Sequence, residues 1–161
     1  MTYSSMIYSL RPARPEDAPV LRALLPRLAE FDVPKNRQTN DLWQGDVRLM
    51  EKLLAGEADN SHVIVAADAS DTPIGMAMYT IKPELLSGER SGHLEALVVH
   101  ENHLRAGLGK RLIESVESDA AQHGATGLSL HVFSNNTRAR SLYEACGFDE
   151  EIVRCYKSLA L

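Results

Sequence analysis

The stretch that decides the fold lies at residues 98–112 and runs Val98-Val99-His100-Glu101-Asn102-His103-Leu104-Arg105-Ala106-Gly107-Leu108-Gly109-Lys110-Arg111-Leu112. An apolar strand leads through a short polar loop into two glycines that open an amphipathic helix. The first backbone N–H groups of a helix have no intrahelical partner, and the helix dipole adds positive character at the same end. Because Gly107 and Gly109 carry no side chain, an anion can approach this backbone closely, and Lys110 and Arg111 can add charge. The stretch therefore predicts an anion-binding turn, with an ordinary tight turn as the alternative.

Hydrophobic periodicity predicts the elements on either side of this stretch. The predicted strands lie at residues 7–12, 62–67, 74–81, 94–99 and 128–133, and the predicted helices at 15–31, 41–54, 108–123 and 136–146. The polar turn at 68–73 between two apolar strands indicates an antiparallel hairpin. Residues 148–159 are expected to be mostly extended and to supply a last strand. Because no repeat, low-complexity tract or linker separates these elements, we expect a single domain over residues 1–161, with one mixed sheet covered by about four helices in an α/β (α+β) fold.

Composition and charge narrow the function classes. The chain has 161 residues with 17 Lys or Arg and 22 Asp or Glu, and its formal net charge of -5 argues against nucleic acid or an anionic membrane as a partner. No apolar run approaches the roughly 20 residues of a membrane span, and the N-terminus lacks the basic and apolar segments of a signal peptide. The two cysteines, Cys146 and Cys155, exclude a disulfide scaffold, so we expect reduced thiols in a cytoplasmic protein.

A second motif occupies residues 135–148, Asn135-Asn136-Thr137-Arg138-Ala139-Arg140-Ser141-Leu142-Tyr143-Glu144-Ala145-Cys146-Gly147-Phe148. Together with Gly107-Leu108-Gly109 it resembles the GNAT superfamily of acyl-CoA-dependent N-acyltransferases. That family combines an (Arg/Gln)-x-x-Gly-x-(Gly/Ala) helix start with a later Asn-x-x-Ala-x-x-Leu-Tyr and Gly-Phe, and the element order fits over nearly the whole chain. The chain departs from the pattern at Leu104, where the family usually has Arg or Gln, and at Ala106, which replaces a frequent Lys or Arg.

The resemblance implies a fold and a cosubstrate. It implies a mostly antiparallel, twisted sheet in which two central parallel strands, 94–99 and 128–133, splay apart and hold acetyl-CoA between them. The backbone of Leu97 and Val99 would pair with the pantetheine arm, and the N–H of Leu97 or Val98 would polarise the thioester carbonyl. Asn136 would hydrogen-bond the pantetheine. The pyrophosphate would be held by the helix start, which comprises Leu104, Arg105, Ala106, Gly107, Leu108, Gly109 and Lys110.

Transfer to an amine requires a group that accepts the amine's proton, because a protonated amine cannot attack a thioester. Glu95 is the candidate, since it interrupts the apolar strand 94–99, where an ionised carboxylate is costly without a partner. The alternative is an edge-facing or ion-paired glutamate with a structural role. The resemblance implies that Tyr143 directs its hydroxyl at the sulfur and protonates the departing thiolate; the alternative is a packing tyrosine.

Other chemistry has weaker support. The histidines and cysteines show no metal-binding spacing, so no metal is expected, and His93, on the same strand face as Glu95, is more often structural at such a position. We expect an N-acetyltransferase acting on a primary amine of a small molecule, such as a polyamine, an amino acid or an amino sugar. Glu30, Asp32 and Asp41 could attract a cationic acceptor. The alternatives are a catalytically silent acyl-CoA-binding regulatory module and a peptide or protein N-acetyltransferase; a homodimer is compatible with the apolar C-terminal stretch.

Overall fold

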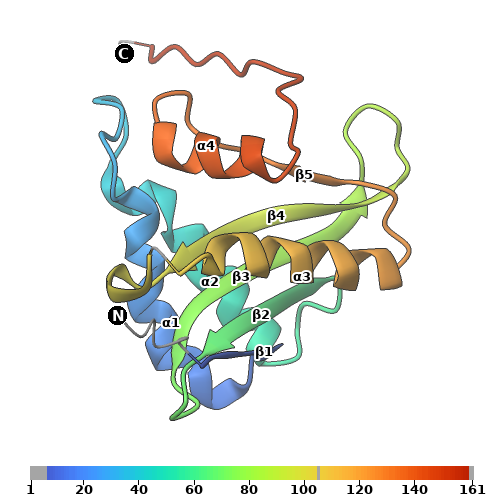
Figure 1. Ribbon diagram of the computed structural model, residues 1–161. Coiled ribbons are helices and arrows are strands. Elements are labelled where there is room, and N and C mark those ends of the chain that lie inside the picture. Colours follow the sequence, from blue (N-terminus) through green and yellow to red (C-terminus); the bar gives the residue numbers. More distant parts are fainter. Residues whose placement is uncertain (1–6, 105, 160–161) are drawn as a thin grey trace.

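The computed structural model describes residues 7–104 and 106–159 (Figure 1). The strands are β1 (Ser9–Pro12), β2 (Ser61–Ala67), β3 (Pro73–Pro83), β4 (Arg90–Val99) and β5 (Leu128–Leu130). The α-helices are α1 (Ala18–Leu24), α2 (Gln44–Leu54), α3 (Leu108–Gln122) and α4 (Thr137–Ala145). Short 3-10 helices lie at Pro15–Asp17, Leu25–Ala29, Thr39–Leu42 and Glu101–His103. Up to α4 the order of strands and helices is the predicted one.

The strands form one sheet in the order β1-β2-β3-β4-β5, antiparallel except for the parallel pair of β4 and β5. The predicted hairpin is confirmed, because β2 pairs with β3 over the whole length of β2, from Ser61 to Ala67. Asp68 holds its turn, since Oδ1 of Asp68 accepts the backbone N–H groups of Ser70 at 2.9 Å and Thr72 at 3.0 Å. The mixed, mostly antiparallel sheet with flanking helices is therefore confirmed.

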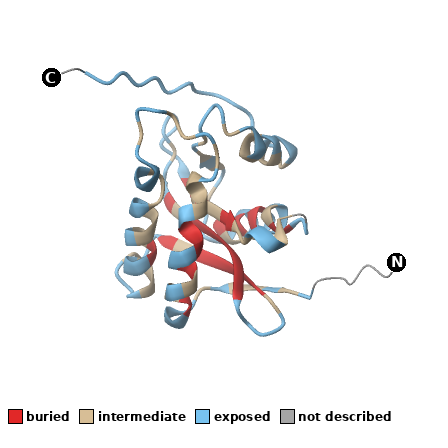
Figure 2. Cartoon of the chain, turned by 90° about the vertical axis from the view of Figure 1, so that its left-hand side faces the viewer, coloured by how far each residue is buried: buried red, intermediate tan, exposed pale blue. Residues whose placement is uncertain are grey.

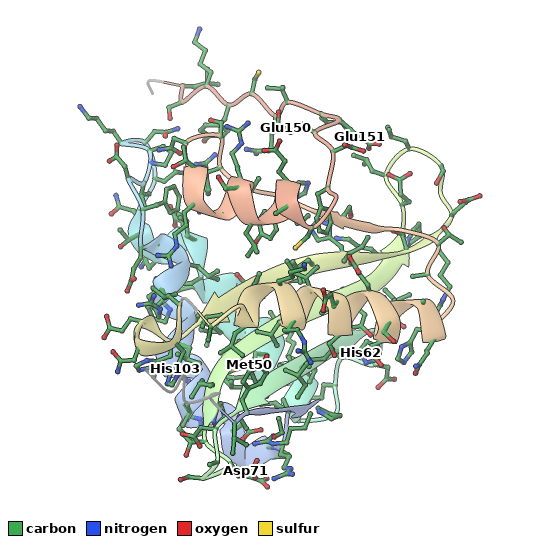
Figure 3. All side chains as sticks on the ribbon, in the orientation of Figure 1. Met50, His62, Asp71, His103, Glu150 and Glu151 are labelled. Atoms are coloured by element: carbon green, nitrogen blue, oxygen red, sulfur yellow. The ribbon has the colours of Figure 1, made fainter. Side chains whose placement is uncertain are left out.

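Helices cover both faces of the sheet. On one face, α1 and α2 bury Leu21 and Met50 completely, and on the other α3 buries Leu112 and Val116 completely. Each such side chain contributes about 1.5–3 kcal/mol through burial. Figure 2 shows the buried residues gathered on the sheet and on the helix faces turned towards it, and Figure 3 shows Met50 in the middle of the molecule. Among the described residues, every helix is too short or too polar to cross a lipid bilayer.

The segment predicted as one helix over residues 15–31 is helical over 15–29, but it is not a single α-helix. The α-helical part spans only Ala18–Leu24, and 3-10 turns flank it on both sides. Pro26 accounts for the break, because proline has no N–H for the helical hydrogen bond and its ring clashes with the preceding turn. Phe31 is thereby released from the helix, and its ring meets that of Phe133 with the ring centroids 5.4 Å apart.

Two further boundaries need correction. The helix predicted over 41–54 begins as a 3-10 turn, and α2 starts only at Gln44, after Trp43 leaves the helical conformation with a φ of -140°. The last strand predicted within 148–159 is absent from the described residues, and none of residues 149–159 takes part in a backbone–backbone hydrogen bond. A strand needs a neighbouring strand, and Figure 1 shows this tail running past α4 instead of along β5.

Candidate active site

The candidate site is a cavity at the place where β4 and β5 stop pairing. β5 pairs with residues Gly92–Leu94 of β4 only, so the strand predicted over 128–133 ends three residues early, at Leu130. Beyond that point the two segments diverge, and a cavity of about 380 Å³ lies between them. Of the predicted site residues, the cavity brings together Glu95, Leu97, Asn136 and Tyr143.

Glu95 is the extra residue of a β-bulge. Tyr79 of β3 pairs with Leu94 and Met78 pairs with Ala96, so Glu95 has no partner in the ladder. A bulge bends its strand and re-aims the side chain, and here the side chain lines the cavity. It is 23% exposed, and the Nζ of Lys82 lies 3.9 Å from its Oε1. Because the carboxylate is both in the cavity and beside a cation, its geometry is compatible with a base and with an ion-paired residue.

Beyond the bulge, the backbone of Leu97 and Val99 points away from β3. The N–H of His100 donates to the carbonyl of Ile74 in β3 at 2.7 Å. Backbone hydrogen bonds alternate along an antiparallel strand, so the backbone of Val98 also faces β3, whereas the N–H and C=O groups of Leu97 and Val99 face the other side. Since β5 has ended, no strand pairs with Leu97 or Val99 on that side. The Nε of Arg27 donates to the Val99 carbonyl at 3.0 Å. The free strand edge beside the cavity is therefore the Leu97 backbone and the N–H of Val99.

The two glycines at the start of α3 have different structural roles. Gly107 precedes the helix with a φ of 71°, a left-handed conformation that glycine adopts without steric cost. A Cβ on Gly109 would lie 3.0 Å from Cδ2 of Leu142, so this glycine allows α3 and α4 to pack closely. The Leu108 side chain is 1% exposed and belongs to the core, which leaves only its backbone for a ligand.

In the described part of this turn, Lys110 lies beside an acidic side chain. The Nζ of Lys110 lies 4.0 Å from Oε1 of Glu114, one helical turn further on. Leu104 is half-buried and Ala106 exposed, and neither carries a charge. Arg105, the remaining predicted contact, lies outside the described residues. In the described part of the turn, backbone N–H groups and the helix dipole are the main attraction for an anion.

α4 brings Asn136 and Tyr143 to the cavity. The Oδ1 of Asn136 caps the helix by accepting the N–H of Ala139 at 3.3 Å, which leaves the side-chain amide N–H groups for a ligand. Tyr143 meets Phe148 edge-on, with ring centroids 5.9 Å apart. Burial, with a further contribution from Cys146, raises the pKa of Tyr143 to about 12. The phenol is therefore protonated at neutral pH and able to donate.

His93 joins β4 to β5 in the segment where the two strands pair. It is 7% exposed, its Nδ1 lies 2.8 Å from Oγ of Ser129, and its ring meets that of His131 edge-on at 4.8 Å. Burial, followed by the charge of Lys82, lowers the pKa of His93. These contacts support a structural role for His93. No three His, Cys, Asp or Glu side chains among the described residues are placed to hold a metal ion.

The sequence reasoning missed one carboxyl of the cavity, Asp46. Of the three acids expected to attract a cationic acceptor, Asp41 lines the cavity, whereas Glu30 forms an ion pair with Arg27 at 2.8 Å and Asp32 is exposed. Asp46 lines the cavity too, and burial, followed by the charge of Glu95, raises its pKa to about 7. Nothing in the sequence around Asp46 distinguishes it from a solvent-exposed helix residue.

Comparison with known proteins identifies the family of the chain. The sequence profile of the acetyltransferase (GNAT) family matches residues 24–148, which contain β4, the helix start and α4. The chain is 29% identical over 143 residues to the uncharacterized N-acetyltransferase YhfO of Bacillus subtilis (strain 168), and the match covers 89% of this chain and 91% of that protein.

Solved structures share the fold across most of the chain. AAC(6')-Iy in complex with the bisubstrate analog CoA-S-monomethyl-acetylneamine superposes with a TM-score of 0.72 at 23% identity, covering 96% of this chain and 99% of that one. The ribosomal-protein-alanine N-acetyltransferase of Brucella melitensis biovar Abortus 2308 superposes with a TM-score of 0.70 at 19% identity, covering 96% and 100%. With the family profile and the Bacillus relative, these matches lead to one conclusion: the chain belongs to the acetyltransferase (GNAT) family and is an acetyl-CoA-dependent N-acetyltransferase.

Proposed function

We propose that this enzyme transfers the acetyl group of acetyl-CoA to a primary amine of a small molecule, by direct attack within a ternary complex. The cavity between the diverging β4 and β5 is the main support for this proposal. It is lined by Glu95 from β4, by Tyr143 from α4 and by Asn136, the N-cap of α4. Direct transfer needs the amine, the thioester and a proton acceptor in one place.

In this proposal Glu95 is the base and Tyr143 the acid. Glu95 takes one proton from the ammonium group, directly or through a water, and the freed lone pair attacks the thioester carbon. The carbon–sulfur bond then breaks, and the Tyr143 hydroxyl gives its proton to the departing thiolate. The attacking nitrogen loses its second proton to the Tyr143 phenolate, which leaves the neutral amide and the CoA thiol, and Glu95 releases the first proton to solvent. The raised pKa of Tyr143 meets one requirement of this role, because the phenol carries a proton at neutral pH.

The proposed acetyl-CoA site runs from β4 to the start of α3. The pantetheine arm would lie along Leu97 and Val99 like an added strand, and the Asn136 amide would donate to it. We assign the thioester carbonyl to the N–H of Leu97, because the backbone of Val98 is directed at β3. The pyrophosphate would lie on the backbone of residues 107–110.

The test combines acetyl-CoA titration calorimetry with thiol release on a mixed amine panel. We expect binding and amine-dependent release in the wild type. Glu95→Gln and Tyr143→Phe should each lower turnover by about 100-fold or more while acetyl-CoA affinity stays within about threefold. The control Glu144→Gln, exposed on α4, should do neither.

The other outcomes of this test identify the alternatives. Binding without release to any amine would identify a silent acyl-CoA-binding module. Release only with peptides would identify a peptide or protein N-acetyltransferase. Absence of binding would contradict the proposed acetyl-CoA site.

We also propose that two copies associate through the C-terminal tail. Along residues 149–159, four large apolar side chains are 56% to 86% exposed: Ile152, Val153, Tyr156 and Leu159. Figure 3 shows Glu150 and Glu151 at the start of this tail, beyond α4. An extended segment with apolar side chains and unpaired backbone is a site for pairing with another chain. Light scattering should give twice the 17.8 kDa of one chain, and Ile152→Ser with Val153→Ser should halve that mass; a monomeric wild type would contradict the dimer.

We place the enzyme in the cytoplasm. This proposal is supported by the two cysteines, Cys146 and Cys155, which are both free thiols, because free thiols are typical of the reducing cytoplasm. Cell fractionation that recovers the protein with the cytoplasmic fraction is the expected result, and recovery from an oxidising compartment would contradict it.

A further inference from the structure

Asp46 is a carboxyl group of the cavity that the proposed transfer steps do not use. It lies in the first turn of α2, is half-buried, and lines the cavity together with Glu95. Asp41 also lines the cavity, but its Oδ2 is engaged by the backbone N–H of Gln38 at 2.9 Å. Within the described residues, the Asp46 carboxyl forms no hydrogen bond and no ion pair. A half-buried carboxyl without a partner needs an explanation.

A role at the helix start does not supply that explanation. An acid in the first turn usually gains from the helix dipole, which favours its ionised form. Here burial, followed by the negative charge of Glu95, outweighs the dipole and raises the pKa of Asp46 to about 7. The side chain also caps no backbone N–H group of α2. Asp46 therefore adds no visible stability to the helix it belongs to.

The protein's own cations at the cavity contact other groups than Asp46. Arg37 and Arg154 line the same cavity. Lys82 lies beside Glu95, with its Nζ 3.9 Å from Oε1. The Arg37 guanidinium lies 4.1 Å from the centre of the Tyr156 ring, and that of Arg154 lies 5.7 Å from the same centre. In the part of the chain that the structure describes, none of these three cations forms an ion pair with the helix carboxyl. Within the described residues, the Asp46 carboxyl thus has no cationic partner, and a cationic ligand would supply one.

We propose that Asp46 binds the ammonium group of the acceptor, opposite Glu95, so that the enzyme selects small molecules with a cationic amine. This inference rests on the proposed function and names the substrate class of the same site. An ammonium group between the two carboxyls favours the ionised form of both and gives Asp46 the partner it lacks. Asp46 holds the amine while Glu95 removes its proton, so loss of Asp46 weakens acceptor binding more than it slows the chemical step.

The experiment measures binding and turnover separately. The complex of the enzyme with CoA, which has no acetyl group to transfer, is titrated with spermidine, kanamycin and glucosamine; N-acetylglucosamine is the neutral match for the last. The same titrations are made with Asp46→Asn and with the charge-conserving Asp46→Glu. Glu51→Gln is the control, because it removes one charge from the same helix at an exposed position that pairs with Arg22. Thiol release from acetyl-CoA is then followed with each amine.

We expect at least one of the three cations to bind the wild type and to lose about tenfold or more in affinity in Asp46→Asn. Asp46→Glu should restore part of the affinity, and Glu51→Gln should stay within about twofold of the wild type. In turnover, Asp46→Asn should raise KM while kcat stays within about threefold.

Three results would overturn this inference: equal affinity of Asp46→Asn and the wild type, no binding of any of the cations to the wild type, or equally tight binding of N-acetylglucosamine. Cation binding that depends on Asp46 but gives no thiol release is a different result. It would contradict the proposed transferase function and leave the ammonium site standing.

Discussion

Replacing Lys82 by Met tests whether Glu95 acts as the base or as a structural ion-pair partner. The Nζ of Lys82 lies 3.9 Å from Oε1 of Glu95, and two unit charges at such a distance attract by about 1 kcal/mol at the dielectric constant of water. Because the Lys82 side chain is 48% exposed, screening leaves about 0.5–1 kcal/mol. Removing this attraction disfavours the ionised carboxylate. On the acid limb of the pH profile, kcat/KM should therefore fall by about two- to fivefold at a given pH.

The assay is the initial rate of amine-dependent thiol release from about pH 5.5 to about pH 9, at subsaturating amine. Lys52→Met serves as the control, since Lys52 is exposed on α2, and it should leave the profile unchanged. Lys82 also lowers the pKa of His93, after burial, so its loss would move a histidine limb in the same direction. The comparison is therefore repeated in a His93→Gln background.

An acid limb that stays in place in both backgrounds would refute the reasoning and leave Glu95 as a structural ion-pair partner. A limb that moves in the wild type but not in His93→Gln would assign the titration to His93. A shift retained in His93→Gln is the result expected for Glu95.

Other perturbations probe the helix start, a buried ion pair and two half-buried titratable groups. Gly107→Ala forces a side chain into a φ of 71°, at a cost of about 1–2 kcal/mol, and calorimetry should show weaker acetyl-CoA binding; unchanged affinity would mean that this turn does not hold the pyrophosphate. Asp17→Ala removes a 5% exposed carboxylate that accepts Nη1 and Nη2 of Arg11 at 2.7 and 3.0 Å, and Arg11 keeps Asp71 as a second partner at 2.8 Å, so urea unfolding should show a loss of about 1–3 kcal/mol; a loss below about 0.5 kcal/mol would contradict the importance of the pair. Burial lowers the pKa of His62, so the unfolded chain binds this proton first and stability falls as the pH drops below about 6.5; urea midpoints should fall less in His62→Gln, and identical curves would contradict the assignment. For Asp46 the pH dependence of stability has the opposite sign, because the pKa of about 7 in the folded state lies above the unfolded value. The wild type should therefore lose stability relative to Asp46→Asn as the pH rises from about 4 to about 7.

Elements with a regular apolar pattern could be predicted from the sequence. The hairpin of β2 and β3 and the start of α3 after Gly107 follow from local patterns of turn residues and apolar spacing. The end of the first α-helix and the absence of a last strand could not be predicted in the same way. The apolar spacing of residues 20–28 continues through Pro26, and the tail 148–159 contains apolar residues although none of the described strands pairs with it. Strand pairing is a non-local property, and a single segment does not contain it.

The sequence offers candidate site residues where a side chain does not suit its local structure or where a family motif names it. Glu95 stands out as a carboxylate inside an apolar strand, and Tyr143 and Asn136 stand out through the family resemblance. The bulge that turns Glu95 into the cavity was not predictable, because it is defined by the register against β3. Asp46 was missed because an acid in the first turn of a helix is ordinary in sequence; only the packing of α2 against the cavity makes it unusual.

The bulge divides β4 into two segments with different tasks. Residues Gly92–Leu94 pair with β5 and belong to the sheet, whereas Leu97 and the residues after it have no partner strand on that side. Glu95 lies between these segments, at the point where a ligand extending along β4 would meet one approaching from α2. Under the proposed function, the acceptor is held from the α2 side and acetyl-CoA from the side of α3 and α4. Substitutions in α2 can then change the acceptor without disturbing the acetyl-CoA site, which is consistent with one fold serving structural neighbours whose names give different acceptors.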